Sequence, residues 1–173
     1  LAADDGLGLP DFRAAERSFQ LLTQVAGRSG RTGNGRVIFQ AWQPEHPVIQ
    51  AAAAHNYQAF IDEELPARKA LGYPPHRRLM RLGVTGKKQG EASEAADRLA
   101  EVIRESFSRP GLTVLGPAPA VFPRLHDRFR FQILIKGTLN KREKVWLRGV
   151  LANLRSSYRG IDAVHDVDPV SVY

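Results

Sequence analysis

The sequence predicts an α+β protein whose C-terminal part is a split βαβ domain, with helices on one face of an antiparallel sheet. Two observations support this fold class. From residue 77 onward, segments of period 2 and period 3.6 follow in the order strand, helix, strand, strand, helix, strand, which is the order of a ferredoxin-like split βαβ unit. In addition, 173 residues with 43% hydrophobic and 25% charged side chains can bury one good core, or one domain plus a fragment of another.

The first 45 residues carry one helix and one strand. Asp11 follows Pro10 as a helix cap would, and the segment Arg13 to Val25 has the helical period. We expect this helix to end at the glycines that follow. The segment TGNGR, Thr32 to Arg36, predicts a turn, and the β-branched and aromatic run Val37 to Trp42 predicts a strand.

A connecting helix is expected over residues 46–71. Its alanine run has the highest intrinsic helix propensity, and Pro66 is expected to break or kink it. Gly72 to Pro75 then marks a boundary. The predicted division is therefore residues 1–45, a connector at residues 46–72, and a domain at residues 73–173.

The C-terminal domain is predicted from six periodic segments. Two helices are amphipathic, and four strands alternate or are rich in β-branched and aromatic residues. In order, the predicted segments are the strand Arg77 to Gly86, the helix Gly90 to Phe107, the strand Thr113 to Leu115, a proline-rich loop from Gly116 to Pro123, the strand Phe129 to Gly137, the helix Leu139 to Tyr158 and the strand Ile161 to Val167.

Composition excludes some classes of function and leaves others open. The formal net charge of +7 predicts a surface that attracts polyanions, a property shared by nucleic-acid-binding, ribosomal and membrane-surface proteins. The absence of cysteine excludes a disulfide framework and a thiolate zinc site in this chain, and the 5 histidines lack metal-ligand spacing, so no metal site is expected. No apolar run approaches a membrane span, and no signal peptide is recognisable, so we expect a soluble cytoplasmic protein.

The stretch QVAGRSGR, Gln24 to Arg31, is the strongest candidate for chemistry. Arg28 and Arg31 lie three residues apart, so a helical or turn-like backbone would direct both guanidiniums the same way, while the glycines permit close approach to a ligand. This arrangement suits a nucleotide phosphate. Glycine and arginine in a basic protein are also typical of a solvated turn or a contact to a nucleic-acid backbone, and the spacing alone leaves these alternatives open.

The flanking residues make this motif specific. QVAGRSGR resembles the last motif of superfamily 2 helicases, and PDFRAAER at Pro10 to Arg17 resembles the motif before it. Further segments are similar to later landmarks of the bacterial primosomal replication-restart helicase (PriA) family, so that nearly the whole chain is covered: PEHPVIQ at Pro44 to Gln50, LGYPP at Leu71 to Pro75, VLGPAPA at Val114 to Ala120, RFRFQILIK at Arg128 to Lys136 and DVDP at Asp166 to Pro169.

The resemblance implies the end of a RecA-like helicase lobe, a connecting helix and a ribosomal-protein-like C-terminal domain. It implies an ATP-dependent 3′ to 5′ DNA helicase that uses ATP and Mg²⁺, with Gln24, Arg28 and Arg31 at the triphosphate. Residues matching Asp4, Asp11 and Arg13 would couple ATP to DNA, although Asp11 is equally explained as a helix cap. The zinc of the family is held by cysteines that this chain does not contain. Without a phosphate loop, this stretch by itself is expected to be inactive as an ATPase.

A second candidate site lies in RLHDRFRFQ, Arg124 to Gln132. Alternation places Arg128, Arg130 and Gln132 on one face of a strand and the two phenylalanines on the other, which also describes a half-buried strand with a basic outer face. The resemblance implies that Arg128 and Gln132 belong to a pocket for the acidic C-terminal tail of the single-stranded DNA-binding protein. Phe129 and Phe131 stand where other members have tryptophan, which leaves the shape of that pocket open.

A diffuse set of basic residues is a candidate DNA contact, although such a set is more often a solvated surface. The set is Arg77, Arg78, Lys87, Lys88 and Arg130.

The resemblance implies that the chain is the C-terminal part of a helicase that recognises stalled or forked DNA and restarts replication by primosome assembly. It also implies other primosome proteins as partners and a location at the bacterial nucleoid. Two alternatives are a non-enzymatic nucleic-acid-binding module with a helicase remnant, and a ribosomal-type RNA binder.

Overall fold

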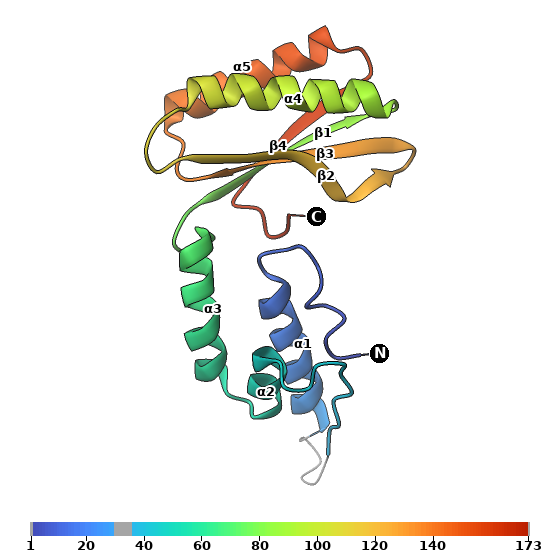
Figure 1. Cartoon of the computed structure of the whole chain (residues 1–173), viewed down its shortest axis with the longest axis vertical. Coiled ribbons are helices and arrows are strands. Elements are labelled where there is room, and N and C mark those ends of the chain that lie inside the picture. The colour runs from blue at the N-terminus through green and yellow to red at the C-terminus, as the bar shows by residue number, and fades with distance from the viewer. Residues whose placement is uncertain (1, 30–35, 173) are drawn as a thin grey trace. The chain divides into compact units, whose positions relative to one another are not determined.

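The computed structural model describes residues 2–29 and 36–172, and it divides the chain into two compact units, Leu1–Leu71 and Gly72–Tyr173. Among the described residues, the first unit contains helices and no strand, and the second contains a sheet with two helices (Figure 1). The elements are α1 (Ala14–Ser29), α2 (Pro47–Ala53), α3 (Tyr57–Leu71), β1 (Leu79–Gly86), α4 (Gln89–Ser106), β2 (Thr113–Leu125), β3 (Arg128–Lys136), α5 (Lys141–Ser157) and β4 (Asp162–Val167). The finer division of residues 1–71 into the end of a lobe and a connector stays a prediction.

The first unit is held together by a small apolar core. Phe19 of α1 stacks on Phe60 of α3 with ring centroids 4.5 Å apart, and Ala52 of α2 is fully buried in the same cluster. A unit of this size buries little area, so this stacked pair contributes a large share of the core.

Two sequence predictions for the first unit are wrong. The helix does not end before the glycines, because α1 continues through Gly27 and Arg28 to Ser29. No strand forms at residues 37–42 among the described residues. That segment keeps the strand-like alternation, with Phe39 packed on the core and Ile38 92% exposed, and a main-chain hydrogen bond from Ala3 N to Gln40 O ties it to the start of the chain. A strand requires a ladder of main-chain hydrogen bonds to a neighbouring strand, and this segment has none in the described part of the unit.

The predicted long helix at residues 46–71 is divided, but not at Pro66. Pro66 lies inside α3, and the break falls at residues 54–56, directly after the alanine run. His55 has a φ of 50°, and the side chain of Asn56 accepts a hydrogen bond from Ala59 N, so the two residues end one helix and cap the next. Local capping therefore outweighs the high helix propensity of the alanines.

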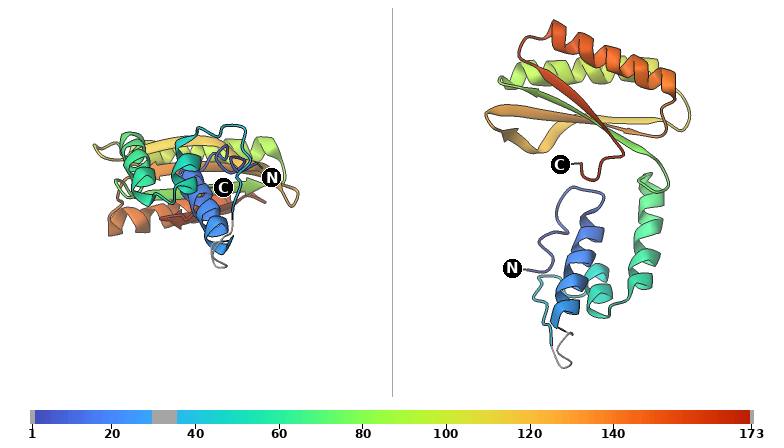
Figure 2. Two further views of the ribbon diagram at one scale, coloured as in Figure 1. Left: turned by 90° about the horizontal axis from the view of Figure 1, so that it is seen from below. Right: turned by 180° about the vertical axis from the view of Figure 1, so that it is seen from behind.

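The second unit is an antiparallel sheet covered on one face by α4 and α5. The strand order is β2-β3-β1-β4, with β1 paired to both β3 and β4. Figure 1 and the right-hand view of Figure 2 place the two helices on the same side of the sheet. The α+β prediction is confirmed here, with the strand order of a split βαβ unit.

The core of the second unit lies between the sheet and its helices. Leu82 and Val84 of β1, and Ile133 and Ile135 of β3, are fully buried against the small residues of α4. Successive strand side chains point to opposite faces, so the residues between these four lie on the face that no helix covers.

Strand β2 is much longer than predicted. It runs from Thr113 to Leu125 and includes the residues expected to form a proline-rich loop. Because β2 is an edge strand, prolines that cannot donate to a ladder are tolerated on its outer side. His126 and Asp127 both have positive φ, at 49° and 57°, which gives a tight two-residue turn into β3.

Candidate functional site

The uncovered face of the sheet in the second unit carries most of the predicted binding residues. Pairing of β1 with β3 places Gln132 opposite Gly83 and Arg130 opposite Thr85. Phe129 and Phe131 pack on the opposite side against the core, as the alternation predicts. The polar residues that share the uncovered face are Arg81, Thr85, Arg128, Arg130, Gln132 and Lys136.

Arg128 is fixed by contacts across the sheet. Its Nε donates to Thr85 Oγ1 at 3.1 Å, and its Nη2 donates to the carbonyl oxygens of Thr85 at 3.0 Å and Gly160 at 3.1 Å. The guanidinium therefore braces β1 and the start of β4. A fixed, charged donor group is pre-organised for an anion, but only its remaining N–H groups can serve a ligand.

Gln132 has an unsatisfied acceptor. Its Oε1 is buried without a hydrogen-bond partner among the described residues, and so is Arg81 Nε on the neighbouring strand. A buried polar atom left unpaired costs roughly 1–3 kcal/mol. Both atoms are covered in this structure, so a bound molecule reaches them only where neighbouring side chains move.

Lys136 closes the other end of this face. Its ammonium lies 3.6 Å from the centroid of the Tyr73 ring, and its pKa is lowered by burial and by the nearby charge of Arg77. A cation–π contact stabilises this buried cation. Sequence reasoning did not select Lys136 or Tyr73 as a pair, because the two residues are distant in the chain.

The predicted DNA-binding residues fall into two groups. Arg78 forms a two-pronged pair with Asp168, which raises the pKa of Arg78 and lowers that of Asp168, and Lys88 Nζ lies 2.7 Å from Glu91 Oε1. Among the described residues, no ion pair is formed by the other three, Arg77, Lys87 and Arg130. These three are the better candidates for contact with phosphate.

The helicase-like motif is only partly within the described residues. Gln24 and Arg28 lie four residues apart on α1, hence on the same face of the helix, and both are exposed. Arg31 lies outside the described residues. An exposed amide and guanidinium on one helix face fit the expectation of a triphosphate contact, which stays a prediction.

The three residues predicted to couple ATP and DNA make contacts within the first unit. Asp4 Oδ2 accepts a hydrogen bond from Gln43 N at 2.8 Å. The buried Asp11 accepts from Arg13 N at 2.9 Å and from Arg17 Nη1 at 3.2 Å, which is the capping role that the sequence left open. The coupling role of these residues stays a prediction.

Arg13 belongs to an ion-pair network between α1 and α3. Its Nη2 lies 2.6 Å from Glu16 Oε1, Glu16 Oε2 lies 3.0 Å from Arg68 Nη2, and Arg68 Nε lies 2.7 Å from Glu64 Oε1. Hydrogen bonds from Arg13, and then from Arg68, hold the pKa of Glu16 below its ordinary value of 4.5, against an opposing effect of burial. The charge of Glu16 therefore stabilises the folded unit.

Substituting Glu16→Gln is expected to lower the free energy of unfolding at pH 7 by about 1–3 kcal/mol. Because the folded pKa of Glu16 is depressed, this stabilisation is present above pH 4.5 and is lost as pH falls through the folded pKa, where the variant and the wild type converge. Urea denaturation from pH 3 to 7, followed by circular dichroism, measures the difference. Glu63→Gln, an exposed change on α3 in the same unit, is the control, and equal stability of the Glu16 variant and this control at pH 7 would contradict the prediction.

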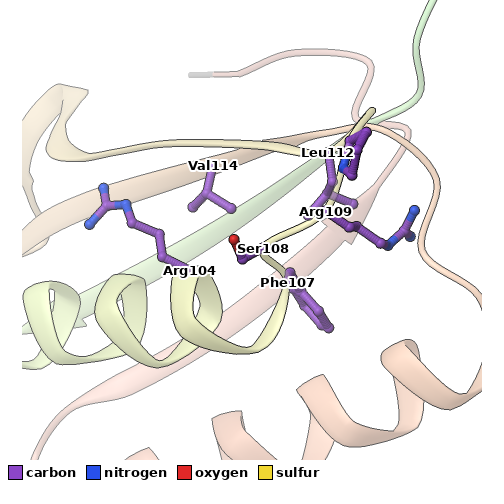
Figure 3. A pocket seen from close by; sticks show the side chains of 7 residues that line it. Arg104, Phe107, Ser108, Arg109, Leu112 and Val114 are labelled. Atoms are coloured by element: carbon purple, nitrogen blue, oxygen red, sulfur yellow. The ribbon is translucent and has the colours of Figure 1, made fainter.

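A hollow of about 430 Å³ lies where α4 ends and β2 begins (Figure 3). Phe107, Leu112 and Val114 line it, with Arg104 and Arg109 at its rim. Both guanidiniums have partners in the protein, because Arg104 donates to Gly116 O and Arg109 Nη2 lies 3.0 Å from Glu143 Oε2. Glu143 offsets the charge of Arg109, whereas Arg104 keeps its charge but has a donor occupied by the carbonyl, so this hollow is a weaker candidate than the uncovered sheet face.

Glu143 also explains how α5 begins. The Asn140 side chain accepts from Glu143 N at 2.9 Å, and Asn140 N donates to Glu143 Oε2 at 2.7 Å, which is a capping box. Burial raises the pKa of Glu143, but the Asn140 N–H and Arg109 outweigh it, so the pKa is lowered on balance. The spacing Asn-x-x-Glu is visible in the sequence and could have located this cap.

No helix within residues 2–29 and 36–172 has the length and apolar character needed to cross a membrane.

Comparison with known proteins identifies relatives of the chain. Residues 69–170 match the family model described as the primosomal protein N C-terminal domain. Relatives named replication restart protein PriA include that of Synechocystis sp., 45% identical over 137 residues (79% of this chain, 16% of the relative), that of Treponema pallidum, 40% over 171 residues (98% and 26%), and that of Bacillus subtilis, 38% over 137 residues (79% and 17%). The chain thus spans about a quarter or less of the length of these relatives.

Proposed function

The chain belongs to the PriA family, as the C-terminal portion of such a protein, and we propose that it serves an ATP-dependent 3′ to 5′ DNA helicase that recognises forked DNA and restarts replication by primosome assembly. In this proposal the second unit binds DNA and partner proteins, and it acts in the cytoplasm at the nucleoid. The observation that carries it is the basic, uncovered face of the sheet, where Arg130 has no ion-pair partner among the described residues.

Binding of the chain to a fluorescent DNA fork, measured over a range of salt concentrations, tests this proposal. Each phosphate contact contributes about 0.9 to the slope of log affinity against log salt. Arg130→Ala is expected to lower both that slope, by about 0.9, and the affinity at low salt. Arg98→Ala is the control, because Arg98 lies on α4, on the other side of the sheet, and pairs with Glu101. No fork binding, or equal losses for the two variants, would refute the assignment.

The proposed motor role rests on the first unit. Residues 37–42 alternate like a strand and leave Ile38 and Trp42 exposed at 92% and 87%, which suits addition to the sheet of a helicase lobe supplied by the rest of a longer polypeptide. Such a lobe would hold ATP and Mg²⁺, and ATP would supply the energy for unwinding. Gln24, Arg28 and Arg31 would then contact the triphosphate, with Asp4, Asp11 and Arg13 coupling it to DNA. The family zinc would lie in another part of that polypeptide.

A second proposed ligand is the acidic C-terminal tail of the single-stranded DNA-binding protein. Supporting it are the fixed guanidinium of Arg128, a donor for carboxylates, and on the same face the unsatisfied Oε1 of Gln132, an acceptor for a peptide N–H. Charge-assisted hydrogen bonds from arginine suit the carboxylates of such a peptide.

Gln132→Leu is the sharper test of this site. Arg128→Ala would also break the contacts with Thr85 and Gly160, whereas Gln132→Leu removes an unsatisfied buried atom and should leave the melting temperature unchanged or higher. A fluorescein-labelled acidic tail peptide is expected to bind this variant roughly 10-fold more weakly. Unchanged peptide affinity would remove Gln132 from the site.

A further inference from the structure

The edge strand β2 carries a pronounced bulge. The register pairs Pro119 with Phe131 and then Arg124 with Phe129, so the four residues Ala120 to Pro123 lie opposite Arg130 alone. Figure 1 shows β2 bending away from the layer of helices before it reaches the hairpin turn. The bulge therefore projects to the side of the sheet on which Arg130 lies. Bulges of this kind redirect side chains and are frequent next to functional sites.

Phe122 is the large apolar side chain that this bulge displays. It is 52% exposed, which is a large fraction for an aromatic ring within a strand. Ala120, two residues earlier, is buried at 5% and anchors the start of the bulge. The exposure of Phe122 thus follows from the bulge and not from a loose end of the chain.

Two arginines of the hairpin lie near the bulge, on opposite faces of the sheet: Arg124 shares the face of Phe129, and Arg130 lies on the uncovered face. Arg124 follows Phe122 by two residues, with its guanidinium 5.4 Å from the centroid of the Phe129 ring, and Arg130 lies opposite the bulge. Arg124 also pairs with Asp127 at 2.9 Å. Arg130, which has no ion pair among the described residues, is therefore the guanidinium that can contact a phosphate beside the bulge.

The hairpin that presents these groups is held by contacts on both sides of its turn. Its two-residue turn at His126 and Asp127 is tight, and the next residue, Arg128, is tied to Thr85 and Gly160 by three hydrogen bonds. A platform held in this way loses little conformational entropy when it binds a ligand.

We propose that Phe122 is a stacking platform for an unpaired base, with Arg130 contacting an adjacent phosphate of the single strand. Proteins that bind single strands without sequence preference combine exposed aromatic rings with a basic surface in this way. A convex bulge with a flat ring suits a base, whereas an apolar peptide side chain would need a concave pocket. The inference rests on the proposed DNA-binding function and names the unpaired strand as its ligand.

The test uses the full chain with a 20-nucleotide single strand carrying 2-aminopurine and a blunt 20-base-pair duplex. Phe122→Ala and Phe122→Leu are expected to weaken single-strand binding between about 5-fold and 100-fold and to abolish the quenching of 2-aminopurine, while duplex binding changes less than about 2-fold. The leucine side chain would keep the apolar contacts of the site, so Phe122→Leu separates stacking from folding. Phe122→Trp should retain both affinity and quenching.

Val145→Ala on α5, 60% exposed, is the matched control and should change nothing. Wild-type affinity for the single strand in both Phe122→Ala and Phe122→Leu would overturn the proposal. It would also be overturned if these variants lost duplex binding to the same extent, or if they lost binding of an acidic peptide but kept binding of the single strand. If the wild-type chain binds duplex and fork DNA and the Phe122 variants bind the single strand as tightly as the wild type, only this inference fails. If no DNA binds the wild-type chain, the proposed function fails with it.

Discussion

Ile133→Ala is expected to lower the free energy of unfolding of the second unit by about 2–5 kcal/mol, whereas Ile38→Ala should change stability by less than about 0.5 kcal/mol. The two substitutions remove the same atoms. Ile133 is fully buried in β3 opposite Leu82, and its truncation leaves a cavity between the sheet and α4. Ile38 is 92% exposed, so its truncation leaves none.

Fluorescence of Trp146 during urea denaturation measures the loss in Ile133→Ala, and helical circular dichroism in the same titration also follows the first unit, which contains Ile38. Trp146 packs on Phe107 in an edge-to-face contact with ring centroids 4.9 Å apart, so its emission reports the second unit. Trp42 is 87% exposed and should change little on unfolding. Similar midpoints for the two variants would contradict the assignment of β3 to the core.

The second unit could be predicted from the sequence because its pattern is local. Ile133 and Ile135 alternate with residues of the uncovered face along β3, and the helix that packs on them repeats alanine and leucine at helical spacing, so period alone gave the order of elements. The residues 116–125 of β2 were missed because prolines favour a loop, and only its place at the edge of the sheet permits a strand there.

The first unit was harder to predict because its structure depends on non-local partners. Residues 37–42 have strand propensity, but a strand needs a neighbouring ladder, and propensity cannot supply one. The continuation of α1 through Gly27 has a small cost, about 1 kcal/mol relative to alanine, which the rest of the helix can offset. Asn56 is a residue type that commonly caps helices, so the break could have been predicted there, but it was expected at Pro66, which lies inside α3.

The candidate site shows the same division between local and non-local information. Alternation alone places Arg128, Arg130 and Gln132 on one face. It cannot show that Arg128 is held by Thr85 and Gly160, which are 43 and 32 residues away, nor that the Oε1 of Gln132 is buried without a partner among the described residues. These contacts change which of the three residues is the best experimental target.

Arg28→Ala, in a polypeptide that also carries the phosphate-binding lobe, is expected to lower the maximal rate of ATP hydrolysis by about 10³-fold. The guanidinium of Arg28 is exposed near the C-terminal end of α1, one helical turn after Gln24, as contact with a ligand held by another lobe would require. A positive charge that contacts the γ-phosphate stabilises negative charge that develops only in the transition state. Its loss should therefore lower kcat and leave the affinity for ATP nearly unchanged.

Steady-state hydrolysis and equilibrium binding of a fluorescent ATP analogue separate these two effects. Lys69→Ala, which removes an exposed positive charge from the last turn of α3 in the same unit, is the control and should keep the normal rate. A variant of Arg28 with normal kcat and weakened ATP binding would place this residue in ground-state binding. A normal rate together with normal affinity would assign it to the solvated end of the helix, and the similarity of QVAGRSGR to a helicase motif would then carry no catalytic role for Arg28.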